Sequence, residues 1–303
     1  MVDITHKSST LRRAVAQATV KVSKQETIDA LVNNKVPKGN VFEMAKTAGL
    51  FGVKKTSDII PDCHPLPVEY TGVTYDIDGL NIYINIEVKT IYKTGVEVEA
   101  MHGASVIALT MYDMLKPIDK GIEVYNIKLL EKQGGKSDFK DKFKKDLTAA
   151  VVVCSDTISA GQKEDKAGKA IIEKLTNCSV NTIEYTIIPD EVEAIQSVLN
   201  KHVAQNTDMI IYTGGTGLST RDITPEAIIP LLDREIPGIA EACRSYGQER
   251  TPFSMLSRSV SGVKNKTLVL ALPGSTKGAS ESMDALFPAL LHIFRILKGA
   301  RHD

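Results

Sequence analysis

The feature that most constrains this chain is a strongly polar window, QGGKSDFKDKFKKDL, at residues 133–147. It holds five lysines and three aspartates, and it separates two long stretches with different apolar patterns. A run of mixed charge cannot bury a core, so it is typical of a linker or of a short solvated helix. A chain of 303 residues is also long for a single core. We therefore predict one domain at 1–137, a charged linker at 138–147 and a second domain at 148–303.

Composition excludes several classes of protein. The 37 basic and 37 acidic side chains cancel, so no general field attracts nucleic acid or an anionic membrane. The first residues lack the apolar core of a signal peptide, and the apolar stretch near 284–297 is interrupted by Pro288, His292 and Arg295. The four cysteines form no CxxC pair, as in a reduced chain without structural zinc or disulfides. We expect a cytoplasmic protein with no nucleic-acid or membrane partner.

The first half mixes helices and strands irregularly. Ser23 followed by Glu26 predicts a capping box at a helix start. The segment DIDG, between two runs rich in Val, Ile, Thr and Tyr, predicts a hairpin. We expect strands at 14–22, 67–76, 80–93 and 123–131, and helices at 24–34, 40–53 and 96–115. This order indicates an α+β domain of ferredoxin-like type, in which helices pack on an antiparallel sheet.

The second half alternates strand, loop and helix instead. Its expected strands lie at 149–155, 182–188, 208–213 and 267–274 and are largely apolar. Such strands are typical of a mostly parallel sheet covered by helices on both faces, which is a three-layer α/β domain. Ligands of these domains bind at the carboxyl ends of the strands. Polar residues at those ends are therefore candidates for a ligand site.

The stretch TGGTGLSTRDITPEA follows the third of these strands. Gly214, Gly215 and Gly217 allow a tight turn in which backbone N–H groups converge on an anion. A Walker loop is excluded because Leu218 follows the last glycine, and a dinucleotide fingerprint is excluded because position 220 is Thr. A tight turn between strand and helix that binds nothing remains the alternative.

Carboxylates adjoin this loop. Asp222 follows Arg221 within it, Asp190 ends the preceding strand in IIPDE, and LPGST at 272–276 follows the last strand. Two carboxylates beside a loop that can hold phosphate are what a nucleotide with Mg²⁺ requires. Taken singly, each aspartate could instead serve a helix start.

Four motifs follow one another in the second half: VCSDTISAGQKEDKAG, IIPDEVE, TGGTGLSTRDITPEA and LPGST. Because of these motifs and their order, the chain resembles the molybdopterin adenylyltransferase family over 148–300. The resemblance implies Mg²⁺-dependent transfer of AMP from ATP to the terminal phosphate of a dithiolene pterin, with release of pyrophosphate. It implies that Asp190 and Asp222 are catalytic and hold the metal. It also implies a pterin and nucleotide cradle of Ser155, Thr213, Gly214, Gly215, Thr216, Gly217, Arg221, Pro273, Gly274 and Ser275.

The pair Cys63-His64 in the first half does not form a nucleophile with its base. Neighbouring side chains of an extended segment point in opposite directions. His64 fits a role as acid, base or phosphate donor, with a structural histidine as the alternative. Cys63 by itself is interpreted as structural.

The predicted helix at 96–115 has an unusual face. Residues spaced three and four apart lie on one face of a helix. This face carries acids, a base and a lysine around an apolar middle: Glu99, His102, Val106, Leu109, Asp113 and Lys116. Glu99 and Asp113 are separated by roughly 21 Å along the axis. One small substrate cannot touch both on one helix. We prefer an arrangement in which this helix packs against its symmetry copy in an oligomer; a solvated face with local pairs is the alternative.

The segments DCHPL, GVEVEA, YDMLK and LLEKQGGKS together resemble the cyclic pyranopterin monophosphate synthase family over 2–137. The resemblance implies conversion of a GTP-derived cyclic triphosphate to cyclic pyranopterin monophosphate and pyrophosphate, with no required cofactor. Asp113 and Lys116 would be the central acid and base, with His64, Glu97 and Glu99 assisting. Substrate would also contact Lys38, Lys54, Asp62, Cys63, Val98, Lys132 and Lys136. A homo-oligomer, trimer or hexamer, with sites at subunit interfaces is implied.

The sequence thus predicts a bifunctional enzyme of molybdenum cofactor biosynthesis whose partners are small pterin and nucleotide substrates, with Mg²⁺ and ATP used by the second half. The alternative for that half is a catalytically silent module that binds or scaffolds the pterin. Retention of both Asp190 and Asp222 argues against the alternative.

Overall fold

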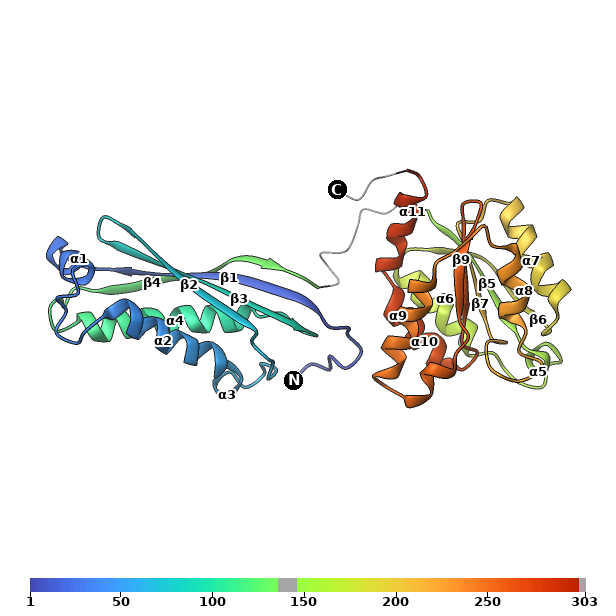
Figure 1. The fold of residues 1–303 in the computed structure, drawn as a ribbon, viewed down its shortest axis with the longest axis horizontal. Coiled ribbons are helices and arrows are strands. Elements are labelled where there is room, and N and C mark those ends of the chain that lie inside the picture. The colour runs from blue at the N-terminus through green and yellow to red at the C-terminus, as the bar shows by residue number, and fades with distance from the viewer. Residues whose placement is uncertain (136–145, 300–303) are drawn as a thin grey trace. The chain divides into compact units, whose positions relative to one another are not determined.

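The computed structural model describes residues 1–135 and 146–299. The chain divides into two compact units, 1–139 and 140–303, and each is described by itself (Figure 1). Most of the predicted linker, and Lys136 with it, lies outside the described residues. Within the described ranges, every helix is too short or too polar to span a lipid bilayer.

The first unit has the element order βαββαβ once its helices are grouped. Its elements are β1 (Thr10–Lys21), α1 (Gln25–Val32), α2 (Val41–Lys54), α3 (Thr56–Ile59), β2 (Tyr70–Asp78), β3 (Asn81–Tyr92), α4 (Glu97–Leu115) and β4 (Glu123–Gln133). The strands form one sheet in the order β2-β3-β1-β4, and every neighbouring pair is antiparallel. The predicted antiparallel sheet with helices is confirmed.

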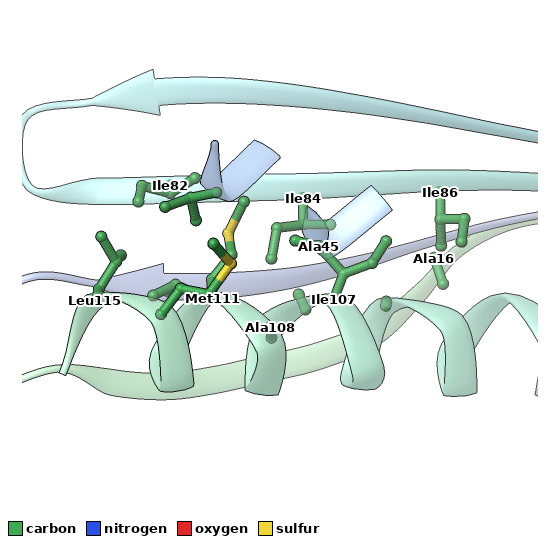
Figure 2. Packing of buried hydrophobic residues seen from close by; sticks show 14 of the residues in the cluster. Ala16, Ala45, Ile82, Ile84, Ile86, Ile107, Ala108, Met111 and Leu115 are labelled. Atoms are coloured by element: carbon green, nitrogen blue, oxygen red, sulfur yellow. The ribbon is translucent and has the colours of Figure 1, made fainter. Parts of the chain in front are cut away.

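The core of this unit lies between the sheet and the helices. Ile82, Ile84 and Ile86 alternate along β3 and are fully buried, as a strand with one covered face requires (Figure 2). They face Ile107 and Met111 of α4, which point toward the sheet in the same view. Helices α2 and α4 pack closely at Gly49, where an added Cβ would lie 2.3 Å from the Ile107 side chain.

The predicted capping box at Ser23 is wrong. Helix α1 begins at Gln25, and its N-cap residue is Lys24, whose side chain makes no capping hydrogen bond. The Ser23 hydroxyl instead donates to Asp119 Oδ1 at 2.5 Å, across 96 residues. Asp119 is 3% exposed and also accepts from Thr27 Oγ1 and the Gly121 amide. The hydrogen bond from Ser23 to the distant Asp119 therefore forms in place of the predicted helix cap.

The second unit contains a six-stranded sheet in the order β6-β5-β7-β10-β9-β8. The four strands β6 (Asn181–Ile188), β5 (Thr148–Cys154), β7 (Met209–Thr213) and β10 (Thr267–Leu272) are parallel. Strands β9 (Val260–Lys264) and β8 (Arg234–Glu235) continue the sheet in antiparallel fashion. The mostly parallel sheet is confirmed, whereas β8 and β9 were not predicted.

Helices cover both faces of this sheet (Figure 1). They are α5 (Asp156–Ser159), α6 (Ala167–Asn177), α7 (Val192–Ala204), α8 (Thr224–Ile228), α9 (Pro237–Gln248), α10 (Thr276–Leu286) and α11 (Ile293–Ile296), with 3-10 turns η1 (Ile229–Leu231), η2 (Pro252–Leu256) and η3 (Ala289–His292). Val151 and Val152 of β5 enter different buried clusters, one containing residues of α6 and α10 and the other residues of α7. Successive side chains of β5 therefore point into two different cores, so both faces of the strand are buried and its sequence is continuously apolar.

Candidate functional site

The polar residues of the second unit gather where its parallel strands end. Strands β6, β5, β7 and β10 are neighbours, so the segments that follow them share one edge of the sheet. The Ser155 amide donates to Ile188 O, and the Gly214 amide donates to Leu272 O, which ties adjacent strand ends together. These bonds hold the predicted loops side by side.

The glycine loop needs glycine at two positions. Gly214 and Gly215 have φ values of 104° and 60°, which side chains rarely adopt. A Cβ at Gly214 would lie 2.1 Å from the Cys154 carbonyl oxygen. A Cβ at Gly215 would lie 2.2 Å from Thr224 Oγ1 and 2.8 Å from Asp190 Oδ1. The loop is therefore pressed against the ends of β5 and β6.

Asp190 lies beneath this loop with one oxygen unsatisfied. Its Oδ2 accepts from the Asp156 amide at 3.2 Å, whereas Oδ1 is buried and has no hydrogen-bond partner among the described residues. Burial raises the pKa of Asp190, and the neighbouring Asp156 and Asp222 carboxylates raise it further. A buried carboxylate oxygen without a donor is unfavourable unless a cation or proton joins it.

Asp222 lies on the other side of the glycine loop. Its Oδ2 accepts from the Ser219 amide at 2.7 Å and would lie 2.9 Å from a Cβ at Gly217. No group of three or more His, Cys, Asp or Glu side chains in the described ranges is arranged to hold a metal ion. Two carboxylates nevertheless fit Mg²⁺, which proteins bind through one or two carboxylates together with substrate phosphates.

Asp156 was missed by the sequence reasoning. Arg221 donates to it twice, from Nε at 2.8 Å and from Nη2 at 2.9 Å. Asp156 Oδ1 also accepts from the Asp190 amide at 3.0 Å. These contacts hold the pKa of the Asp156 carboxyl below its ordinary value, with the Asp190 amide as the larger cause. The signal was a carboxylate two residues past the end of a strand, since Asp156 follows β5 at the same distance as Asp190 follows β6.

Arg258 was also missed, and no local pattern could have revealed it. Its Nε donates to Gly217 O at 2.7 Å and its Nη2 to Asp222 O at 2.6 Å. Its amide donates to Thr216 O at 3.0 Å, and its guanidinium pairs with Glu226. Arg258 therefore braces the glycine loop from a segment more than thirty residues away.

The remaining predicted cradle residues adjoin these loops. Thr213 is buried and its Oγ1 donates to Pro273 O at 2.8 Å, while a Cβ at Gly274 would lie 2.8 Å from Gly214 Cα. Ser155 Oγ accepts from the Ile158 amide, and Ser275 Oγ accepts from the Gly278 amide, so each caps a helix. The structure therefore brings all three predicted loops to one sheet edge.

In the first unit, Asp113 lies between two lysines. Lys38 Nζ is 2.7 Å from Asp113 Oδ2, and Lys116 Nζ is 2.7 Å from Asp113 Oδ1. Hydrogen bonds from Lys116 and then Lys38 hold the pKa of Asp113 at about 2, and Asp113 raises the pKa of Lys116. The trio lies at the carboxyl end of α4 and is half exposed.

A second group lies at the other end of α4. Lys132 Nζ is 2.6 Å from Glu97 Oε1, and Cys63 Sγ donates to Glu99 Oε1 at 3.1 Å. Glu99 is 3% exposed, so burial raises its pKa, which the bond from Cys63 partly offsets. Burial, with Glu99 nearby, raises the pKa of the Cys63 thiol to about 12. The thiol is therefore not a nucleophile at neutral pH.

The N-terminal segment contacts the loop around Cys63. The terminal amine is 2.7 Å from Asp62 Oδ1, and His64 Nε2 lies 2.7 Å from Val2 O. His102 contacts Thr56 Oγ1 at 3.1 Å through Nδ1. Lys54 and Val98 are exposed, the latter by 43%. The predicted site residues of this unit thus form two groups near opposite ends of one helix.

Two family models match this chain, one in each half. The MoaC family matches residues 1–135, and the family described as a probable molybdopterin binding domain matches 150–292. The molybdenum cofactor biosynthesis bifunctional protein of Chlorobaculum tepidum is 38% identical over 302 residues, covering 100% of this chain and 96% of that protein.

Two further relatives match one half each. The cyclic pyranopterin monophosphate synthase of Listeria innocua is 45% identical over 138 residues, covering 45% of this chain and 86% of that protein. A solved structure of the molybdopterin biosynthesis enzyme MoaB from Thermus thermophilus is 40% identical, with a TM-score of 0.49, covering 52% of this chain and 99% of that chain. Since the Chlorobaculum tepidum relative covers the whole of this chain, the chain belongs to the bifunctional proteins of molybdenum cofactor biosynthesis, with a MoaC family domain followed by a domain of the probable molybdopterin binding family.

Proposed function

We propose that the second unit transfers AMP from ATP to the terminal phosphate of molybdopterin and releases pyrophosphate. The observation that carries this proposal is the unsatisfied, buried Asp190 Oδ1 beside a glycine loop whose other side holds Asp222. A divalent cation shared by these carboxylates and the triphosphate would satisfy that oxygen. Mg²⁺, when bound, would neutralise and align the phosphates.

The chain's own residues would position the reactants. The backbone of residues 214–217 would surround phosphate oxygens because the positive φ values turn it tightly around that point. Arg221 would add positive charge at the mouth of the loop, where Asp156 now holds it. Transfer of a nucleotidyl group needs orientation and charge neutralisation more than proton transfer. A site made of aspartates, an arginine and a glycine loop, without a dedicated base, can supply orientation and charge neutralisation.

The test is pyrophosphate release by the full chain with molybdopterin, ATP and Mg²⁺. Asp222→Ala should lower the rate at least about a hundredfold, as removal of a group that stabilises the transition state does. Asp233→Asn, a surface aspartate paired with Lys264, is the matched control and should leave the rate unchanged. An unchanged rate for Asp222→Ala would refute the assignment. Binding of molybdopterin without turnover by the wild-type chain would favour a silent pterin-binding module.

We propose that the first unit converts the GTP-derived cyclic triphosphate to cyclic pyranopterin monophosphate. The name of its Listeria innocua relative supports the reaction. Ring opening and closure require several proton movements, and carboxylates and lysines held in pairs are suited to them. Asp113 would stay ionised between Lys38 and Lys116, leaving Lys116 as the acid. Asp113→Ala should abolish product formation, while Asp29→Asn on the exposed side of α1 should not alter it.

We further propose that this unit works as a homo-oligomer, a trimer or hexamer, with sites at subunit interfaces. The two groups of predicted residues lie at opposite ends of α4, roughly 21 Å apart by helix rise. Between them, Leu109 is 62% exposed and Tyr112 is 40% exposed, so α4 presents apolar surface that a neighbouring subunit could cover. The βαββαβ order supports the ferredoxin-like description.

A further inference from the structure

His102 lies on α4 one turn beyond Glu99, so the two side chains share a face of the helix. It is outside the motif GVEVEA, which ends at Ala100. Its side chain is half-buried, and its Nδ1 lies 3.1 Å from Thr56 Oγ1 of α3. This contact decides what the imidazole can do beside Glu99.

The hydroxyl of Thr56 fixes which nitrogen of His102 carries a proton. Its own proton is directed to the backbone, because Oγ1 donates to Val53 O at 3.0 Å and to Gly52 O at 3.1 Å. The oxygen then accepts from His102, which assigns the proton of the neutral ring to Nδ1. Thr56 is 1% exposed, so water has little access to this contact. The proton that His102 gains or loses is therefore the one on Nε2.

An imidazole fixed in this way changes its charge without changing its contacts. Nδ1–H donates to Thr56 Oγ1 in the neutral ring and in the imidazolium alike. Histidine is also the residue type whose charge ordinarily changes near neutral pH. His102 can therefore switch a positive charge on and off beside its neighbours while its ring stays in place.

Glu99 is the neighbour that such a charge affects. Its side chain is 3% exposed, and Cys63 Sγ donates to its Oε1 at 3.1 Å. Burial is the largest cause of the raised pKa of Glu99, while the bond from Cys63 and the charge of His102 lower that pKa. Little water screens a carboxyl at this depth, so a nearby charge acts on it strongly. The burial of Glu99 distinguishes this pair from a solvated pair on a helix surface.

Other titratable and charged groups surround this part of α4. They are Lys54 and Lys55 at the end of α2, Asp58 of α3, Cys63 and His64 of the following loop, Glu97 of α4 and Lys132 of β4. Lys55 pairs with Asp58 at 3.0 Å, and Lys132 pairs with Glu97 at 2.6 Å. Of the described side chains that shift the pKa of Glu99, which are those of Cys63, Glu97 and His102, only the imidazole is of a type that changes charge near neutral pH.

We propose that His102 is a positioning residue of the first unit, whose imidazolium, held by Thr56, keeps the buried Glu99 carboxyl ionised. When Nε2 gives up its proton, Glu99 can take one up. The two forms of the pair, imidazolium with carboxylate and imidazole with carboxylic acid, have the same total charge and differ only in which group holds the proton. A carboxyl that serves as base or as acid suits a reaction with several proton movements. The use of this pair in catalysis rests on the proposed synthase function, whereas the charge relation does not.

The first test measures the charge of Glu99 directly, without substrate. Infrared difference spectra of the full chain are recorded against pH, and the band of Glu99 is identified by its loss in Glu99→Gln. At the pH where Glu99 is half ionised in the wild type, His102→Gln should lower the ratio of ionised to protonated Glu99 about tenfold, because the positive charge is gone. His102→Lys keeps a positive charge and should hold Glu99 ionised at least as well as the wild type does.

A matched control comes from the same helix. Ser105→Ala removes a half-buried hydroxyl that donates to Met101 O, and it should leave the ionisation of Glu99 as in the wild type. His102→Gln and His102→Lys differ in charge, so equal ionisation of Glu99 in these two variants would overturn the proposal. Far-ultraviolet circular dichroism of each variant verifies that the first unit is folded.

The second test follows kcat for cyclic pyranopterin monophosphate across pH. His102→Gln should lower kcat about tenfold at the acidic end, where Glu99 is protonated, and leave it unchanged at the alkaline end. A structural role would lower kcat equally at every pH. If the wild type forms product and the ionisation of Glu99 shifts but the profile does not, the positioning role is wrong. If the ionisation shifts as expected but the wild type forms no product, the charge relation stands and the proposed reaction is wrong.

Discussion

Arg258 Nη2 donates a hydrogen bond to the backbone oxygen of Asp222 at 2.6 Å, although the two residues lie 36 positions apart. The same guanidinium donates to Gly217 O at 2.7 Å. Both ends of the loop from Gly217 to Asp222 are thus attached to one rigid planar group. The position of the Asp222 carboxylate therefore depends on a residue from a distant segment that no predicted motif contains.

This relationship predicts that Arg258→Ala lowers kcat of AMP transfer by about 10-fold to 100-fold, since small displacements of a positioned group cost about that much. Arg258→Lys should restore little, because an ammonium cannot make both carbonyl bonds in that geometry. The Mg²⁺ concentration for half-maximal activity should rise in both variants. Glu226→Gln, which removes only the exposed ion pair, should change kcat less than about threefold. Equal effects of Glu226→Gln and Arg258→Ala would contradict the bracing role.

Gly215→Ala should destabilise the second unit by about 2–4 kcal/mol, because alanine would be strained at positive φ and its Cβ would clash with Thr224 and Asp190. Gly161→Ala is the matched control. Gly161 also has positive φ, at 71°, but nothing lies within 4 Å of an added Cβ. It should lose only about 1 kcal/mol. Urea unfolding of the full chain measures both values, and similar losses would show that the close approach at Gly215 is unimportant.

Asp119→Asn should lower the free energy of unfolding of the first unit by about 2 kcal/mol at neutral pH. Burial alone would raise the pKa of Asp119, but hydrogen bonds from Ser23, Gly121 and Thr27 outweigh it and hold the pKa at about 2, below its ordinary 3.8. A lowered carboxyl pKa stabilises the fold above the unfolded value and loses that effect as the pH falls toward the folded value. The difference between wild type and variant should therefore shrink between neutral pH and pH 2–3. A constant difference across this range would exclude the linkage.

Asp113→Ala and Glu99→Ala chains should each be inactive in forming cyclic pyranopterin monophosphate, and should partly regain activity when unfolded together and refolded into mixed oligomers. The physical reason is the length of α4, which keeps these residues apart within one subunit. Random mixing would leave some interfaces with both wild-type residues. Refolded single variants serve as controls. Absence of any recovery, with mixed oligomers demonstrated by mass, would argue against shared sites.

Much of the fold followed from patterns that are local in the sequence. The β-branched run of β3 and the apolar spacing of α4 were placed within a few residues of their observed bounds, Asn81–Tyr92 and Glu97–Leu115. The strand at β7 followed by three glycines predicted a turn that the observed φ values confirm. Periodicity and turn chemistry act over a few residues, so they can be read without knowing the fold.

Other features depended on partners far away along the chain. Ser23 had the sequence of a helix cap, yet it bonds to Asp119. Arg258 had no distinguishing pattern, yet it braces the glycine loop. The short strand β8 pairs only because β9 lies beside it. Such interactions form only after the sheet has brought the segments together, so no local sequence pattern predicts them.

The sequence by itself determined the kinds of element in each half of the chain and supplied the hypothesis for the residues that carry phosphate chemistry, because both depend on composition and short-range spacing. The tertiary structure alone decided which oxygen of Asp190 is left without a donor and which arginine holds Asp222. The physical reason is that burial and hydrogen-bond satisfaction are properties of packed neighbours, and these neighbours come from distant parts of the chain.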